Sequence, residues 1–184
     1  VLALALALQA DGGDAARLAE AAQDGRASAV QSLIARGAKI DEPDATGTTP
    51  LMLAAAQGHT AVVRLLMSAG ANINASDRDA ITALMRAAAS NRIDTVALLL
   101  ASGADPNLRT RDGATALTAA AFGGYDDVVS RLLERGADPA VADQQGRTPM
   151  MAAAMNGHTP VVQALLTKGA SATRPRRRCE GSAS

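Results

Sequence analysis

The fold is decided by the stretch from Asp44 to Ser76, DATGTTPLMLAAAQGHTAVVRLLMSAGANINAS, because it recurs along the chain every 33 residues. The recurring positions are Thr49, Thr82, Thr115 and Thr148, and the pairs Ala54-Ala55, Ala87-Ala88, Ala120-Ala121 and Ala153-Ala154. A fixed period of this length is the signature of a protein that is built from stacked structural repeats. We therefore predict one elongated, repetitive domain.

Each copy of the stretch reads as two short helices that are joined by tight turns. Gly47 suits a turn, because glycine adopts a positive φ without strain. Thr49 is well placed to cap a first helix, and Pro50 suits its first turn. Gly58 is expected to end that helix, and Thr60 to cap a second one. Neither helix can bury its apolar face alone, so the copies are expected to stack.

The copy resembles the ankyrin repeat. The family pattern can be followed in Gly47, Thr49-Pro50-Leu51, Ala54-Ala55, Gly58-His59, Val62-Val63, Leu65-Leu66 and Gly70-Ala71-Asn72. One departure is systematic, because the position where the family often has His is occupied here by Met52, Met85, Thr118 and Met151. The hydrogen bonding that this His usually makes is therefore expected to be missing. The resemblance implies an all-α ankyrin-repeat solenoid of helix-turn-helix units with β-turn or hairpin fingers.

We predict five units of 33 residues in residues 11–175, with the boundaries 11–43, 44–76, 77–109, 110–142 and 143–175. The first unit is degenerate and is expected to be the N-terminal cap, whose outer face must be wettable. Its polar residues are Asp14, Arg17, Glu20, Gln23 and Asp24.

Two residues break the glycine pattern of the third unit. Ala80 replaces the turn glycine, which costs about 1–2 kcal/mol if φ stays positive. Asn91 replaces the glycine that ends the first helix, and asparagine tolerates that position well.

The composition of the chain argues against nucleic acid as a partner. Its 18 basic and 18 acidic residues cancel, so it has no overall basic field to hold phosphates. One Phe, one Tyr and no Trp provide no platform for stacking bases.

No arrangement of residues indicates catalysis. The single Cys excludes an internal disulfide framework and a cysteine-based zinc site. The only histidines, His59 and His158, lie three units apart and cannot share a metal ion. No Ser-His-Asp triad and no phosphate-binding loop appears. We therefore predict no enzymatic activity, no cofactor and no small-molecule substrate.

The N-terminal segment, residues 1–10, reads VLALALALQA and is too short to span a bilayer. It looks like the end of a signal-peptide core that is followed by small residues, with cleavage after Ala10 or Ala7. This pattern predicts a periplasmic or secreted protein, with a cytoplasmic location as the alternative. Two other interpretations are an apolar helix that packs against the first unit, and the remnant of a membrane anchor.

The C-terminal segment, residues 176–184, is predicted to be a solvated basic and Gly-Ser tail. It contains Cys179, whose neighbour Arg178 could make the thiol reactive by lowering its pKa. An incidental thiol is the simpler interpretation, and an intermolecular disulfide is the alternative. We expect a monomer, with a dimer through the N-terminal segment or Cys179 as the alternative.

The resemblance implies that the chain binds a protein partner through a concave face, which is built from turn tips and the inner side of each first helix. The candidate partner-binding residues are Thr46, Thr48, Gln57, Arg78, Asp79, Ile81, Ser90, Arg111, Asp112, Phe122, Tyr125, Gln144, Gln145, Arg147, Met155 and Asn156. Phe122 is expected to be the main anchor, with space beside it at Gly123. Tyr125 occupies the position of the two histidines and is expected to be structural. Alternative functions are an accessory, protective or inhibitory subunit of a periplasmic enzyme, such as a catalase or cell-wall peptidase, and a membrane-tethered scaffold.

Overall fold

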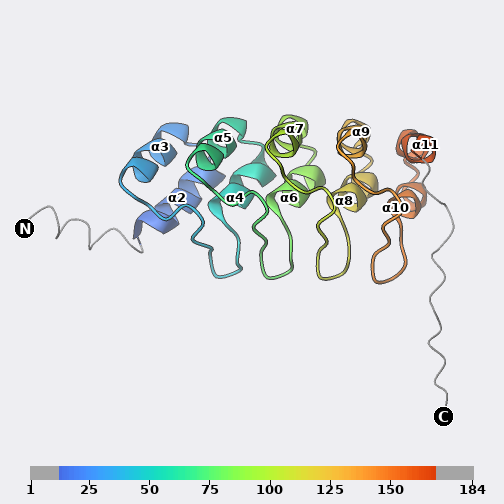
Figure 1. The fold of residues 1–184 in the computed structure, drawn as a ribbon, viewed down its shortest axis with the longest axis horizontal. Helices are drawn as coiled ribbons and strands as arrows, with labels where there is room; N and C mark the ends of the chain where they lie inside the picture. Colours follow the sequence, from blue (N-terminus) through green and yellow to red (C-terminus); the bar gives the residue numbers. More distant parts are fainter. Residues whose placement is uncertain (1–12, 169–184) are drawn as a thin grey trace, which may run out of the picture.

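The computed structural model describes residues 13–168, in which ten helices follow one another as five pairs (Figure 1). The helices are α2 (Gly13–Gln23), α3 (Ala27–Ala35), α4 (Pro50–Gln57), α5 (Thr60–Ser68), α6 (Ala83–Ala89), α7 (Ile93–Ala101), α8 (Ala116–Gly123), α9 (Asp126–Glu134), α10 (Pro149–Met155) and α11 (Thr159–Thr167). The predictions for residues 1–10, for residues 176–184 and for Cys179 lie outside the described residues.

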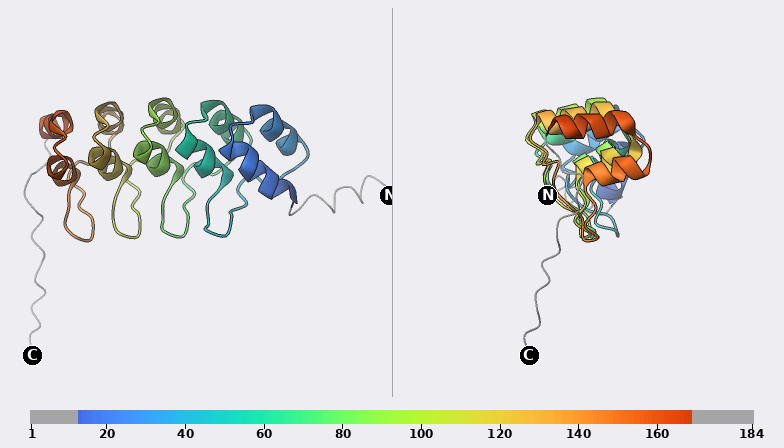
Figure 2. Two further views of the ribbon diagram at one scale, coloured as in Figure 1. Left: turned by 180° about the vertical axis from the view of Figure 1, so that it is seen from behind. Right: turned by 90° about the vertical axis from the view of Figure 1, so that its right-hand side faces the viewer.

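The helices form two rows, with long loops on one side (Figures 1 and 2). The even-numbered helices make one row, in which α6 packs against α4 and α8. The odd-numbered helices make the second row, in which α7 packs against α5 and α9. Between residues 13 and 168 the only strand-like pairing outside helices is an isolated bridge from Ser76 to Thr82. This arrangement confirms the predicted all-α repeat fold.

Threonine caps the first helix of four pairs, as predicted. The Thr49 hydroxyl accepts the backbone N–H of Met52 at 3.4 Å. Thr82, Thr115 and Thr148 make the same bond to the residue three positions on. At Thr115 the bond is reciprocal, because Thr118 accepts the N–H of Thr115 in turn. Thr118 is one of the residues that replace the usual His.

The prediction that Thr60 caps the second helix is wrong. The cap residue is His59, whose side chain makes no cap hydrogen bond, and Thr60 is already the first helical residue. The hydroxyl of Thr60 donates backwards to the carbonyl of Gly58 at 3.2 Å. It therefore stabilises the turn between the helices rather than the N–H groups of α5.

Ala80 and Asn91 hold positive φ angles of 60° and 56°, and they are the only non-glycine residues between 13 and 168 that do so. The equivalent residues in the second pair are Gly47 at 89° and Gly58 at 80°. The turns therefore require a left-handed residue at these positions whichever side chain is present.

The core combines a large buried side chain at the same position of every even-numbered helix with Val and Leu side chains of the odd-numbered helices and the paired alanines. The residues at that position of the even-numbered helices are Leu18, Leu51, Leu84, Leu117 and Met150, all of them buried. The alanine pairs of α4, α6 and α8 are fully buried, which allows neighbouring helices to approach closely. Ala154 of the last pair is exposed, because no further described helix packs against it.

The prediction that the polar residues of the N-terminal cap form a wettable outer face is wrong for Asp14. Arg17, Glu20, Gln23 and Asp24 are exposed, as a wettable face requires, but Asp14 is buried. Its carboxylate lies 2.7 Å from a terminal nitrogen of Arg36 at the end of α3. Asp14 is also in the first turn of α2, where a negative charge is favourable. The carboxylate thus joins the two helices of the first pair.

Candidate partner-binding surface

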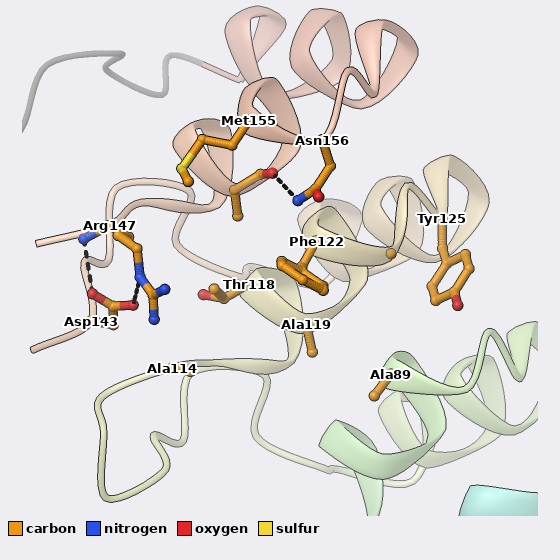
Figure 3. Close-up of a pocket in the computed structure, with 12 residues that line it drawn as sticks. Ala89, Ala114, Thr118, Ala119, Phe122, Tyr125, Asp143, Arg147, Met155 and Asn156 are labelled. Atoms are coloured by element: carbon orange, nitrogen blue, oxygen red, sulfur yellow. Dashed lines mark hydrogen bonds and ion pairs between the residues drawn. The ribbon is translucent and has the colours of Figure 1, made fainter. Parts of the chain in front are cut away.

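A hollow lies beside α8 and α10, and Asp143 and Arg147 of the loop that precedes α10 contribute to its lining (Figure 3). We call the exposed side of the even-numbered helices, together with the loops that follow the odd-numbered helices, the groove. The hollow is a pocket in this groove with a volume of about 480 Å³. Its lining residues are Ala89, Ala114, Thr118, Ala119, Phe122, Gly123, Tyr125, Asp143, Arg147, Ala152, Met155 and Asn156.

Phe122 and Met155 form an apolar strip across the pocket. They are 63% and 76% exposed, and in residues 13–168 the only other exposed large apolar side chain is Leu166 of α11, at 54%. Both occupy the same register position, where α4 and α6 have Ala56 and Ala89. The apolar surface of the groove therefore increases in size toward α10.

Arg147 and Asp143 form an ion pair at the edge of the pocket. The Nε of Arg147 donates to Asp143 Oδ2 at 2.7 Å, and the side chains are 55% and 2% exposed respectively. Burial raises the pKa of Asp143, but the backbone N–H and guanidinium of Arg147 and the N–H of Gln145 together hold that pKa below its ordinary value. Asp143 therefore stays ionised at neutral pH, underneath an exposed cation.

Two earlier loops also contain an aspartate that accepts backbone N–H groups of its own turn. Asp44 accepts the hydroxyl of Thr46 and the backbone N–H groups of Thr46 and Thr48, and the hydroxyl is the main reason that the pKa of Asp44 is lowered. Asp77 receives a guanidinium from a different element, because Arg86 of α6 donates to its Oδ2 at 2.7 Å. In these loops the aspartate orders the turn, and a neighbouring polar side chain donates a hydrogen bond to it.

The prediction that Gly123 leaves space for a partner is wrong. A Cβ on Gly123 would collide with the ring of Tyr125, so the ring of the chain itself fills that space. Tyr125 is half-buried and packs against the core, which agrees with the structural role expected for it.

A side chain reaches back to the preceding pair from the register position of Tyr125. His158 Nε2 lies 3.0 Å from the carbonyl oxygen of Phe122, and His59 Nε2 lies 3.0 Å from that of Gln23. Arg92 makes the equivalent bond to Ala56 at 3.1 Å. The ring of His158 therefore donates a hydrogen bond to the backbone carbonyl of Phe122, the residue with the largest apolar side chain of the groove.

Most of the other predicted residues lie on the groove surface. The exposed ones are Thr46, Gln57, Arg78, Asp79, Arg111, Asp112, Gln144, Gln145 and Asn156, whereas Ile81 and Ser90 are half-buried. The prediction that Thr48 binds a partner is wrong, because Thr48 is only 3% exposed and a partner cannot reach it. Its hydroxyl accepts from Arg86 at 3.1 Å and shares a bond with Thr46.

The sequence reasoning missed four small or buried residues that line the pocket, namely Thr118, Ala119, Asp143 and Ala152. The Asp-to-Arg spacing of four across the last loop was a usable signal for Asp143, because a carboxylate that orders a turn also attracts a nearby cation. The alanines carry no signal of their own.

Residues 13–168 contain neither a candidate metal site nor a candidate membrane-spanning helix. No group of three or more His, Cys, Asp or Glu side chains there could hold a metal ion. None of the helices in that range combines the length and the apolar character that crossing a bilayer requires.

A protein-family model described as ankyrin repeats in three copies matches residues 18–110 and again residues 102–176. The two matches together extend over most of the chain, including the groove and the pocket. A comparison with curated proteins found no match.

Proposed function

Because this chain belongs to the ankyrin-repeat family, whose repeats generally mediate binding between proteins, we propose that it is a non-catalytic module that holds a protein partner in its groove. The exposed loops supply a polar rim, and the pocket beside α8 and α10 supplies the apolar centre. This division matches the usual anatomy of protein interfaces, in which a polar rim surrounds an apolar core.

The exposure of both Phe122 and Met155 in the lining of one pocket is the observation that carries the proposal. Burying a side chain of this size is worth about 1.5–3 kcal/mol, and leaving it in water forgoes that stabilisation. A monomer that exposes two such residues in one hollow has an unsatisfied surface there. Binding energy at interfaces is usually concentrated in a few anchors of this kind.

The proposal is tested by one substitution and a matched control. The partner is first recovered from the source cell on the immobilised chain and purified. Phe122→Ala should then weaken its binding at least tenfold, which corresponds to about 1.4 kcal/mol. The melting temperature should hardly change, since most of the Phe122 side chain is exposed.

Leu166→Ala is the control, because Leu166 is similarly exposed but lies on α11, outside the pocket. It should leave the affinity unchanged. If Phe122→Ala instead lowers the melting temperature strongly and leaves the affinity intact, Phe122 is a core residue and the proposed anchor is wrong.

The location of the chain is part of the same proposal. The apolar segment in residues 1–10 supports export, so the expected partner is a periplasmic or secreted protein. The identity of that partner would separate a general scaffold from an accessory, protective or inhibitory subunit of an exported enzyme.

A further inference from the structure

The pocket beside α8 and α10 presents a single kind of charge to the solvent. Asp143 and Arg147 are the only charged residues in its lining. Asp143 is buried, whereas more than half of the Arg147 side chain is exposed. A partner that enters the pocket therefore meets an apolar strip and one guanidinium.

The guanidinium of Arg147 is held in place. Nε donates to Asp143 Oδ2, and Nη2 donates to Gln145 Oε1 at 3.2 Å. Asp143 Oδ1 accepts the backbone N–H groups of Gln145 and Arg147 at 2.9 and 2.8 Å, so the carboxylate remains anchored to its own loop. Figure 3 shows the guanidinium on the side of Asp143 that faces Thr118, with Phe122 beyond it.

Covering this guanidinium has a cost that depends on the partner. A partner that packs on Phe122 and Met155 removes water from the nearby Arg147, and a charged group that loses water without a new acceptor is destabilising. A carboxylate replaces the lost water with a charge-assisted hydrogen bond. A lysine or arginine of the partner would instead face a like charge.

Resting on the function proposed above, we infer that the partner presents an acidic, apolar segment. One large aliphatic or aromatic side chain of that segment packs between Phe122 and Met155, and an Asp or Glu carboxylate close to it in sequence binds Arg147. A singly charged carboxylate fits better than a phosphate group. Phosphate carries nearly two negative charges and is usually bound by several arginines, whereas this lining offers one that already pairs with Asp143.

The inference is tested on the full chain with three matched sets of short synthetic peptides. Every peptide has one Leu, Ile or Phe in a Gly-Ser background, and the sets differ only in whether Glu, Gln or Lys flanks the apolar residue. Binding is measured by NMR titration of the chain labelled with ¹³C at the methionine methyl groups, because Met155 is in the pocket and strongly exposed.

The Glu peptides should shift the Met155 signal and bind about fivefold or more tightly than the Lys peptides, with the Gln peptides between them. This ratio corresponds to about 1 kcal/mol, the upper range for an exposed ion pair. Arg147→Gln should remove the preference for Glu over Lys but keep the preference for an apolar residue, and Arg147→Lys should retain both. Arg131→Gln is the matched control, since Arg131 is exposed on α9, outside the groove, and does not line the pocket.

If Glu and Lys peptides shift the Met155 signal with equal affinity, the acidic partner is wrong while the groove proposal stands. If no peptide shifts Met155 and Phe122→Ala also leaves the natural partner bound as before, both proposals are wrong. The comparison of Glu and Lys peptides on the unmodified chain gives the answer even if Arg147→Gln is too unstable to use.

Discussion

Replacing Ala80 with glycine should make the protein more stable, although the change removes a methyl group and adds no contact. Ala80 has a φ of 60°, in the left-handed region. That conformation costs an L-residue about 1–2 kcal/mol. The turn cannot relax it, because Asp77 accepts the N–H groups of Asp79 and Ile81 through its side chain and that of Ala80 through its carbonyl.

Glycine removes this strain but adds freedom to the unfolded chain. The added freedom is worth about 0.4–1 kcal/mol against the folded state. The difference between the two ranges leaves a net gain of about 0–1.6 kcal/mol for Ala80→Gly, with a midpoint of about 0.8 kcal/mol. For a chain of this size, 1 kcal/mol corresponds to a rise of about 2–4 °C in the melting temperature.

Urea unfolding followed by far-UV circular dichroism measures the gain, provided that the m-values of parent and variant agree. Asn91→Gly is a matched comparison at φ 56°, and its gain should be smaller because asparagine tolerates this conformation. Gly47→Ala is the reverse change. It should be destabilising, since φ is 89° and the new Cβ would lie 3.0 Å from the backbone nitrogen of Arg78. An Ala80→Gly variant that is less stable than the parent would refute the reasoning about backbone strain.

Three further predictions concern the core, the acid range and the N-terminus. Leu84→Ala should cost about 2–5 kcal/mol in urea unfolding, because Leu84 of α6 is buried in the core; a loss below about 0.5 kcal/mol would contradict its place there. The lowered pKa of Asp143 should stabilise the folded chain fully above the ordinary value of 3.8 and less as the pH falls through the folded-state value; the stability difference between the parent and Asp143→Asn should therefore shrink in acid, and a constant difference would contradict this. Mass spectrometry of the native protein should find a new N-terminus close to Ala10, and a cytosolic protein that retains residues 1–10 would contradict the export prediction.

The sequence alone predicted the helices well because the residues that begin and end each helix recur in several copies. Thr49 and its equivalents mark the start of a helix in four copies, and a signal that returns at a fixed period is hard to mistake. The repeat also indicated that Ala80 would be strained if its φ stayed positive, since glycine occupies its position in the other copies, and its φ is 60°.

Apart from the cap assigned to Thr60, the wrong predictions concern positions that the side chain of another residue reaches. The ring of Tyr125 occupies the room above Gly123, and Arg36 binds Asp14 from the next helix. Thr48 is buried partly because Arg86 crosses to it from the following pair. A periodic pattern indicates which residues share a position, but it does not indicate which direction a long side chain takes between two copies.

The hydrogen bonds that join successive helix pairs also determine which changes in chain length the protein can tolerate during evolution. The backbone N–H groups of Asn72, Asp105 and Asp138 each donate to the side chain of the residue 31 positions earlier. The bonds from His59, Arg92 and His158 span 36 residues in every case. If one whole unit of 33 residues were duplicated, each of these donors would again lie beside an equivalent acceptor in the preceding unit. The deletion of one whole unit would keep this pairing as well. We therefore expect the length of this protein to be free to vary in evolution by whole units, whereas the loss or gain of a single residue inside a unit would break the bonds on both sides of it.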